Sequence, residues 1–160
     1  MNAQARDRRI VVGVDSSHGS RVALRWALAQ ARLTGATVEA VAAWQNPAMI
    51  GYSYGWVPAE FEGESIAGAA EKALAEAVAD VAGADPESPP VVTRIAEGPP
   101  AQVLLSAATG AELLVVGSRG HGAFAGMLLG SVSQHCVQHA PCPVVVIPDE
   151  AGSAAGSLPL

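Results

Sequence analysis

The sequence has few of the features that mark membrane, exported or disulfide-bonded proteins. No apolar run approaches the length of a membrane span, because Gly, Pro or a charged residue interrupts each run within about ten residues. The N-terminal residues MNAQARDRR lack the apolar core of a signal peptide, so we expect a cytoplasmic protein. Cys136 and Cys142 are the only cysteines, and in that compartment we expect both to be free thiols.

Lysine is nearly absent, and the overall charge is acidic. The formal net charge of −6 argues against general attraction to nucleic acid, and the basic residues near the N-terminus are dispersed as on a solvated helix face. Lys72 is the only lysine, so the chain has no Gly-Lys-Ser/Thr step of the P-loop kind. Any phosphate would be held mainly by backbone amides and hydroxyls, which predicts modest affinity and poor stabilisation of a transferring phosphoryl group.

Aromatic residues make up only 4% of the chain, whereas Ala and Val are abundant, as in Ala-rich helices packed on Val-rich strands. Short apolar runs alternate with stretches of helical spacing. The expected strands are residues 10–14, 37–44, 91–95, 113–116 and 144–147, and the expected helices are residues 20–33, 65–81, 101–108 and 131–139. This alternation predicts an α/β fold, an open parallel five-stranded sheet with helices on both faces. The loops after the first, second and fourth strands are then expected to hold a ligand.

We expect a single domain at residues 9–148. It lies between a flexible N-terminal tail at 1–8 and a disordered tail at 149–160 that is rich in Gly, Ser and Ala. Residues 45–64 show no periodicity over an unusual length. We interpret that segment as a functional flap or a mobile connector.

The segment after the fourth expected strand reads GSRGHG at 117–122 and GSVS at 130–133. Glycine lets the backbone approach a ligand closely. Gly130 and Ser131 stand at the head of the last expected helix, where unpaired N–H groups and the helix dipole favour an anion. The hydroxyls of Ser131 and Ser133 can donate to phosphate oxygens or face a phosphate-bound divalent metal. A tight β–α connection capped by Ser131 would explain the same residues without a ligand.

The spacing of these glycines resembles a known pattern. Gly, two residues, Gly, nine residues and Gly-Ser is the nucleotide-binding signature of the universal stress protein family, and the chain matches it without a gap at Gly117, Gly120, Gly130 and Ser131. The segments IVVGVDSS (10–17), VEAVAAW (38–44), ELLVVGSRGHG (112–122) and GSVSQHCVQHAPCPVVVIP (130–148) are also similar to that family. The resemblance implies a Rossmann-like, adenine nucleotide alpha hydrolase-like fold in the branch that binds ATP.

The resemblance also implies four groups of nucleotide contacts. The adenosine would be flanked by Gly13, Val14 and Asp15, and the adenine edge would meet a backbone group of Ala43. The ribose would lie beside Val116 and Gly117. The phosphates, bridged by Mg²⁺, would contact Gly120, Gly130, Ser131, Val132 and Ser133. The hydroxyl of Ser131 is the one protein group expected to be able to contact the metal.

Other reactive side chains are better explained without catalysis. Asp15 lies at the end of an expected strand, a position where catalytic carboxylates occur, but the sequence places no second carboxylate or histidine with it. His121 is interpreted as an exposed loop residue, whereas the Arg119 guanidinium matches phosphate geometry. His135 and His139 are four residues apart with both cysteines nearby, but the spacing matches no zinc motif and a hydrophilic helix face explains it.

Two classes of function fit these residues. The first is a regulatory, energy-sensing ATP-binding protein of the stress response without efficient catalysis, with no nucleic-acid or membrane partner. The resemblance implies that it is a homodimer through the apolar edge strand Val144–Ile147. The second is a slow ATPase or nucleotidyl-transferring enzyme, although the chain lacks the His-x-Gly-His motif and the Ser-Gly-Gly-x-Asp-Ser loop. A cyclic-AMP-binding protein on the same scaffold stays open, because the two serines after Gly130 suit either ligand.

Overall fold

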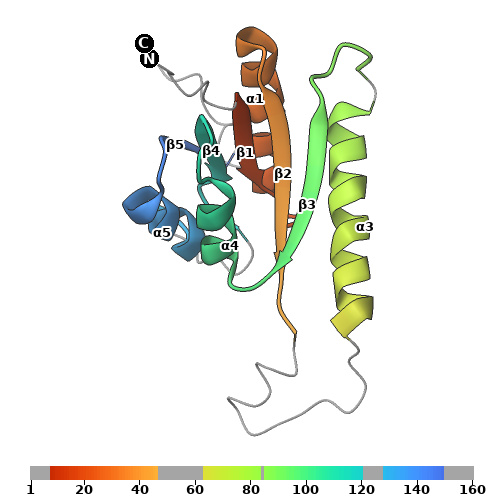
Figure 1. The fold of residues 1–160 in the computed structure, drawn as a ribbon, viewed down its shortest axis with the longest axis vertical. Helices are drawn as coiled ribbons and strands as arrows, with labels where there is room; N and C mark the ends of the chain where they lie inside the picture. The colour runs from red at the N-terminus through yellow and green to blue at the C-terminus, as the bar shows by residue number, and fades with distance from the viewer. Residues whose placement is uncertain (1–7, 47–62, 84, 121–127, 150–160) are drawn as a thin grey trace, which may run out of the picture.

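The computed structural model describes residues 8–46, 63–83, 85–120 and 128–149. Strands and helices alternate along this part of the chain in the predicted order (Figure 1). The strands are β1 (Arg9–Gly13), β2 (Thr37–Trp44), β3 (Val91–Glu97), β4 (Leu113–Gly117) and β5 (Val144–Ile147). The helices are α1 (His18–Thr34), α3 (Gly63–Ala82), α4 (Pro100–Ala107) and α5 (Ser131–His139). The bounds of β2, α5 and β5 are those expected.

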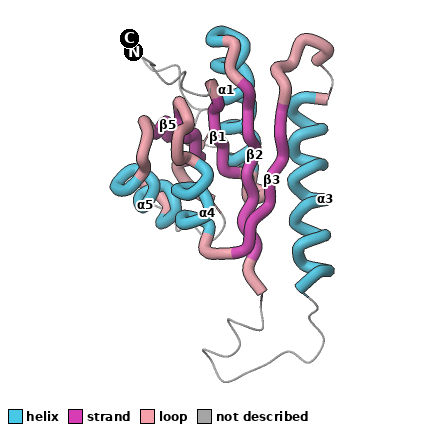
Figure 2. The backbone as a smooth tube through the Cα atoms, in the orientation of Figure 1, coloured by secondary structure: helices cyan, strands magenta, loops and turns pink. Residues whose placement is uncertain are grey.

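The strands form one sheet in the order β3-β2-β1-β4-β5, and every neighbouring pair is parallel. Ile10 of β1 lies opposite Val38 of β2 on one side and opposite Leu113 of β4 on the other. Figure 2 shows β2 and β3 on one side of β1 and β5 on the other. Since β4 lies between β1 and β5, the strand order reverses between β1 and β4. The predicted fold class, an open parallel five-stranded sheet of Rossmann-like type with helices on both faces, is confirmed.

Helices cover both faces of the sheet. Helices α1 and α3 pack against one face, and α4 and α5 pack against the other (Figure 1). Along β1, the side chains of Ile10 and Val12 point to α1 and α3, whereas Val11 points to α4 and α5, and all three are fully buried. Because both faces are covered, the strand reads as a continuous apolar run instead of alternating with polar residues.

Serine side chains fix the turn between β1 and α1. Ser16 has a φ of 68°, a left-handed conformation that is uncommon outside glycine. Ser17 is the N-cap of α1, because its Oγ accepts a hydrogen bond of 3.2 Å from the Ser20 N–H. Gly35 caps the end of the helix, and its φ of 74° is typical of a glycine that follows the last helical residue. The turn places the first residues of α1 at the carboxyl end of β1, beside the reversal of strand order.

Among the described residues, no helix combines the length and apolarity that crossing a membrane requires. Residues 1–7 and 150–160 of the expected tails, residues 47–62 of the aperiodic segment and His121 lie outside the described residues. The domain bounds of 9–148 and the role of the aperiodic segment therefore stay predictions.

Candidate functional site

A cavity of about 530 Å³ opens at the carboxyl edge of the sheet, where the strand order reverses. This volume is in the usual range of small-molecule sites. The structure brings all eleven residues predicted to contact the nucleotide together in its wall. They are Gly13, Val14, Asp15, Ala43, Val116, Gly117, Gly120, Gly130, Ser131, Val132 and Ser133. Their individual contacts with a ligand stay predictions.

The wall also contains residues that the predicted set left out. These are Ser16, Ser17, Ser20, Val41, Ala42, Ala70, Ala73, Leu74, Pro100, Leu104 and Arg119. The serines follow the first strand in a helix-capping pattern, which was a usable sequence signal. The residues of α3 and α4 carried no such signal, because their place in the wall depends on how the helices pack on the sheet. Arg119 was considered as a phosphate partner on its chemistry alone.

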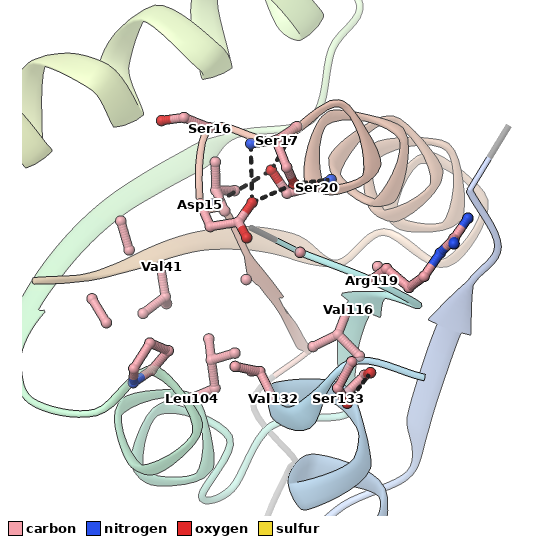
Figure 3. A pocket seen from close by; sticks show the side chains of 18 of the residues that line it. Asp15, Ser16, Ser17, Ser20, Val41, Leu104, Val116, Arg119, Val132 and Ser133 are labelled. Carbon is pink, nitrogen blue, oxygen red and sulfur yellow. Dashed lines mark hydrogen bonds between the residues drawn. The ribbon is translucent and has the colours of Figure 1, made fainter. Parts of the chain in front are cut away.

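The cavity has a polar half and an apolar half (Figure 3). The turn after β1, the loop after β4 and the start of α5 line the polar half. The end of β2 and the facing sides of α3 and α4 line the apolar half, with Val41, Leu74 and Leu104 as its largest side chains. Figure 3 shows the side chains of Asp15 and Ser17 across the cavity from Leu104. An occupant with one apolar and one strongly polar end would match both halves.

The N-terminus of α5 opens into the polar half without a side-chain cap. Its N-cap is Gly130, with φ −68° and ψ 166°, and no side chain of the described residues accepts from the first N–H groups. Ser131, the first helical residue, is exposed. The N-terminus of α1 differs, because Ser17 caps it. The α5 terminus therefore offers unpaired N–H groups and the positive end of a helix dipole to an anion.

Ser133 has a role that the sequence did not indicate. Its side chain is 2% exposed, and its Oγ donates to the carbonyl oxygens of Ser118 and Gly130, each at 3.0 Å. The Ser118 carbonyl also accepts from the Gly130 N–H at 2.7 Å. These bonds fix the loop after β4 to the start of α5. While they hold, the single hydroxyl proton of Ser133 is in use, so a phosphate contact would come from its backbone N–H.

Asp15 is held at the mouth of the β1–α1 turn. Its Oδ1 accepts from the N–H of Ser17 at 3.0 Å and from the Ser17 hydroxyl. A Cβ atom at Gly120 would lie 2.5 Å from Asp15 Oδ2, closer than such atoms approach. Gly120 thus leaves room for the Asp15 carboxylate, and this steric demand exists before any ligand binds.

Two loops meet backbone to backbone beside this carboxylate. A Cβ atom at Gly117 would lie 3.1 Å from the Gly19 carbonyl oxygen, and one at Gly19 would lie 3.1 Å from the Arg119 carbonyl oxygen. The exit of β4 therefore packs directly on the first turn of α1. Gly19 was absent from the predicted site, because it belongs to no glycine-rich segment and its neighbour is about a hundred residues away along the chain.

The two cysteines and two histidines of the C-terminal region lie outside this wall. Cys136 and Cys142 are free, and burial raises the pKa of the Cys136 thiol to about 11. His135 and His139 are exposed, with ring centroids 4.7 Å apart. Within the described parts of the chain, no three His, Cys, Asp or Glu side chains gather as a metal site. A hydrophilic face of α5 accounts for the histidine pair.

Comparison with known proteins gives the chain a family. The Universal stress protein family matches residues 7–148. A universal stress protein of Mycobacterium tuberculosis is 31% identical over 166 residues, which cover 94% of this chain and 51% of that protein. The chain spans about half the length of the curated relatives it matches.

Solved structures share the fold. A universal stress protein in complex with cAMP superposes with a TM-score of 0.57 at 25% identity, covering 88% of this chain and 96% of that one. A universal stress protein family protein from Arabidopsis thaliana with AMP bound gives a TM-score of 0.56 at 19% identity, covering 90% and 93%. The second likeness shows the fold alone. Given the family match over nearly the whole sequence, this chain belongs to the universal stress protein family.

Proposed function

We propose that this chain is a regulatory ATP-binding protein that holds the nucleotide without cleaving it efficiently. The main support is the uncapped start of α5, which opens on the cavity beside Gly117, Gly120 and Gly130. Exposed N–H groups and close backbone approach suit phosphate oxygens. The cAMP-bound and AMP-bound structures show that proteins of this fold hold adenine nucleotides.

The two halves of the cavity suit the two ends of the nucleotide. The adenine ring would lie in the apolar half, near the backbone of Ala43 and the side chain of Leu104. The phosphates would lie against the start of α5 in the polar half. Val116, the residue before the last of β4, also lines the cavity and would face the ribose. This orientation buries the aromatic ring and leaves the charged groups near N–H donors.

Mg²⁺ would bridge the phosphates in this proposal. Mg²⁺ usually keeps several waters and takes only one or two protein ligands when it is bound to a nucleotide. The hydroxyl of Ser131 is exposed in the cavity wall and is the group that we propose faces the metal.

The wall is better suited to holding a nucleotide than to cleaving it. Asp15 is the only carboxylate among the described lining residues, and the backbone N–H and hydroxyl of Ser17 already donate to it. Arg119 is the only cationic side chain among them. Phosphoryl transfer depends on several charged groups that stabilise the transition state. A slow ATPase is the alternative, and steady turnover that Asp15→Asn abolishes would favour it.

We also propose that the protein is a homodimer through β5. This strand pairs with β4 and lies at the edge of the sheet, with Val144, Val145 and Val146 partly exposed. An unpaired apolar edge favours pairing with a second strand. Sedimentation equilibrium at protein concentrations from about 1 to about 100 μM should show a dimer. A monomer at every concentration would contradict the proposal.

Isothermal titration calorimetry with ATP, ADP, AMP and cyclic AMP, each with and without Mg²⁺, tests the nucleotide proposal. We expect micromolar or tighter ATP binding, strengthened by Mg²⁺. Gly130→Ala is the variant of choice, because among the described residues a Cβ there meets nothing closer than 3.5 Å and the fold should persist. Gly120→Val is less informative, since it would also displace Asp15.

Gly68→Ala on α3 is the matched control, because a Cβ there has no neighbour within 4 Å in the described part of the chain. It should bind ATP as the unaltered protein does. Gly130→Ala should weaken ATP binding while its circular dichroism and thermal unfolding stay normal. No binding of any nucleotide by the unaltered protein would overturn the proposal. Tight binding of cyclic AMP with weak binding of ATP would replace ATP with the cyclic nucleotide as the ligand.

A further inference from the structure

Arg119 and Asp149 occupy matching positions beyond two paired strands. Gly117 of β4 lies opposite Ile147 of β5 in the parallel register, and the Ser118 N–H donates to the Ile147 carbonyl at 2.8 Å. Arg119 and Asp149 each lie two residues farther along. Their side chains form an ion pair, with Arg119 Nη2 3.4 Å from Asp149 Oδ2. The sheet register therefore brings this pair together.

The Arg119 backbone belongs to the cavity wall although its charge is directed elsewhere. A Cβ atom at Gly130 would lie 3.5 Å from the Cα of Arg119, so Arg119 stands beside the uncapped start of α5. Figure 3 shows its guanidinium directed away from Asp15 and Leu104. Among the described residues of the wall, Arg119 is the only cationic side chain and Asp15 the only anionic one. With Arg119 paired to Asp149, the charge nearest a polyphosphate would be that of Asp15.

The pair is of a kind that can exchange partners. The side chains of Arg119 and Asp149 are 33% and 26% exposed, so water weakens their attraction. Arg–phosphate contacts are charge-assisted and often bidentate, and each added phosphate strengthens the pull on the guanidinium. The long arginine side chain can turn about its own bonds without moving the backbone that fixes the loop.

We propose that Arg119 leaves Asp149 for the terminal phosphates of a bound nucleotide, so that this pair sets how strongly the site prefers ATP to AMP and cyclic AMP. The inference rests on the proposed nucleotide function and makes it specific. Arg119 is the residue that senses the phosphate charge, and Asp149 competes for it. Removing the competitor should therefore strengthen ATP binding, whereas removing Arg119 should weaken it.

The test is titration calorimetry with ATP, ADP, AMP and cyclic AMP on five proteins: unaltered, Arg119→Gln, Arg119→Lys, Asp149→Asn and the double variant Arg119→Gln/Asp149→Asn. Arg119→Gln should weaken ATP binding about tenfold and change AMP and cyclic AMP binding little. Asp149→Asn should tighten ATP binding about threefold. In this proposal Asp149 affects ATP binding through its pair with Arg119, so the double variant should bind ATP as Arg119→Gln does. Arg119→Lys keeps the charge and should retain most of the ATP preference.

Each outcome decides a different question. If all five proteins bind nucleotides with one unchanged ratio of ATP to AMP affinity, the inference is wrong and the proposed function stands. Weaker ATP binding in Asp149→Asn would also overturn it, since the aspartate would then support the site. If the unaltered protein binds none of the four nucleotides, the proposed function itself fails. The pair of Asp149 with Arg119 is partly exposed, so we expect normal thermal unfolding of Asp149→Asn, and this is measured beside the titrations.

Discussion

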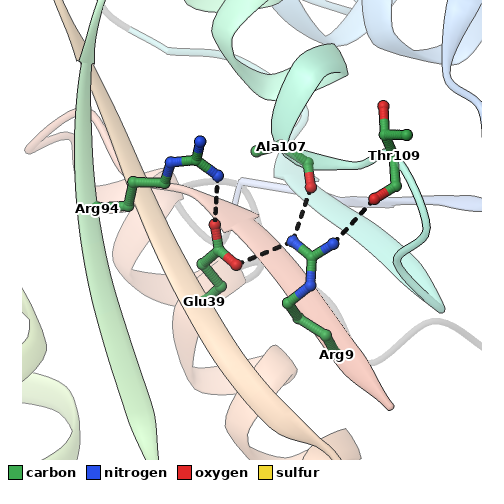
Figure 4. A network of polar contacts seen from close by, with 5 residues as sticks. All are labelled: Arg9, Glu39, Arg94, Ala107 and Thr109. Atoms are coloured by element: carbon green, nitrogen blue, oxygen red, sulfur yellow. Dashed lines mark hydrogen bonds and ion pairs between the residues drawn. The ribbon is translucent and has the colours of Figure 1, made fainter. Parts of the chain in front are cut away.

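The amino end of the sheet holds a buried carboxylate, Glu39, whereas the carboxyl end holds Asp15 in the wall of a cavity. Glu39 is 8% exposed and lies between two arginines, 2.9 Å from Arg9 and 3.3 Å from Arg94 (Figure 4). Arg9 also donates to the carbonyl oxygens of residues 107 and 109, at the end of α4. The charges of this network are matched by other groups of the same chain, and the cation lies at the negative end of a helix dipole.

The carboxyl end has the opposite arrangement. There the start of α5 lacks a side-chain cap, Ser131 is exposed, and the wall faces an open cavity. At the amino end, Glu39 and its two arginines are paired with one another, while the polar groups at the carboxyl end are placed for an added partner. In a parallel sheet, a crevice opens at the carboxyl ends of the strands where the strand order reverses, because the loops on either side lead to opposite faces of the sheet. A ligand can bind in that crevice. Substitutions at the two ends should therefore separate stability from binding.

Glu39→Ala should have the largest effect on stability. The substitution leaves Arg9 and Arg94 without the carboxylate that pairs with them, and the free energy of unfolding should fall by about 3 kcal/mol. This is the lower end of the range for breaking a buried ion pair, because Arg9 keeps its hydrogen bonds to two carbonyl oxygens. Urea unfolding measures the change. Asp80→Asn is the control, because its pair with Arg21 is exposed and worth about 0.5 kcal/mol or less. ATP affinity that fell along with stability would contradict the separation of the two ends.

The rates at which Cys136 and Cys142 are alkylated should show that α5 is packed against the sheet although its N-terminus is open. Burial raises the pKa of Cys136 to about 11, from an ordinary 9.0. At pH 8 its thiolate fraction is then about a hundredfold below that of an ordinary thiol. Iodoacetamide should modify Cys142 first, because its side chain is only partly buried. Mass spectrometry of timed samples identifies the order, and faster reaction at Cys136 would contradict the buried packing of α5.

A matched pair of serines tests the carboxyl end itself. Ser133→Ala removes the buried hydroxyl bonds to Ser118 and Gly130, and the unfolding free energy should fall by about 1 kcal/mol. Ser131→Ala removes an exposed hydroxyl and should leave stability within about 0.5 kcal/mol while weakening ATP binding several-fold. Urea unfolding and calorimetry on both variants give the two quantities. If both changes lowered the free energy of unfolding equally, the assignment of Ser133 as structural and Ser131 as ligand-facing would be wrong.

Local sequence was enough to predict the fold. Gly and Pro breaks between apolar runs placed every strand and helix of the described chain, and the largest difference in a strand was two added residues at the end of β3. Those residues, Ala96 and Glu97, lie opposite Ala43 and Trp44 of β2. Their pairing depends on a strand some fifty residues away, so the apolar pattern of residues 91–95 alone could not show it.

The sequence predicted the polar half of the cavity wall but little of its apolar half beyond Ala43, which came from the family resemblance. The glycine spacing predicted the polar half because phosphate contacts through backbone groups leave a pattern in one short segment. The apolar half depends on α3 and α4, and Leu104 reads in sequence as an ordinary core residue. Gly19 and Asp149 were missed for the same reason, since each acts on the loop after β4 from a distant part of the chain.

The smallest expected effect is at Asp85, an exposed counterpart of Glu39 in the turn before β3. The backbone N–H of Glu87 and the guanidinium of Arg32 hold the pKa of Asp85 below its ordinary 3.8. A depressed pKa in the folded state stabilises the protein above the unfolded-state value, and this contribution is lost as the pH falls below 3.8 through the lower folded value. Asp85→Asn should therefore be slightly less stable than the unaltered protein at pH 7 and equally stable at the acid end. Urea unfolding at low ionic strength across this range measures the gap, and a gap that stayed constant with pH would show that the carboxylate charge contributes nothing.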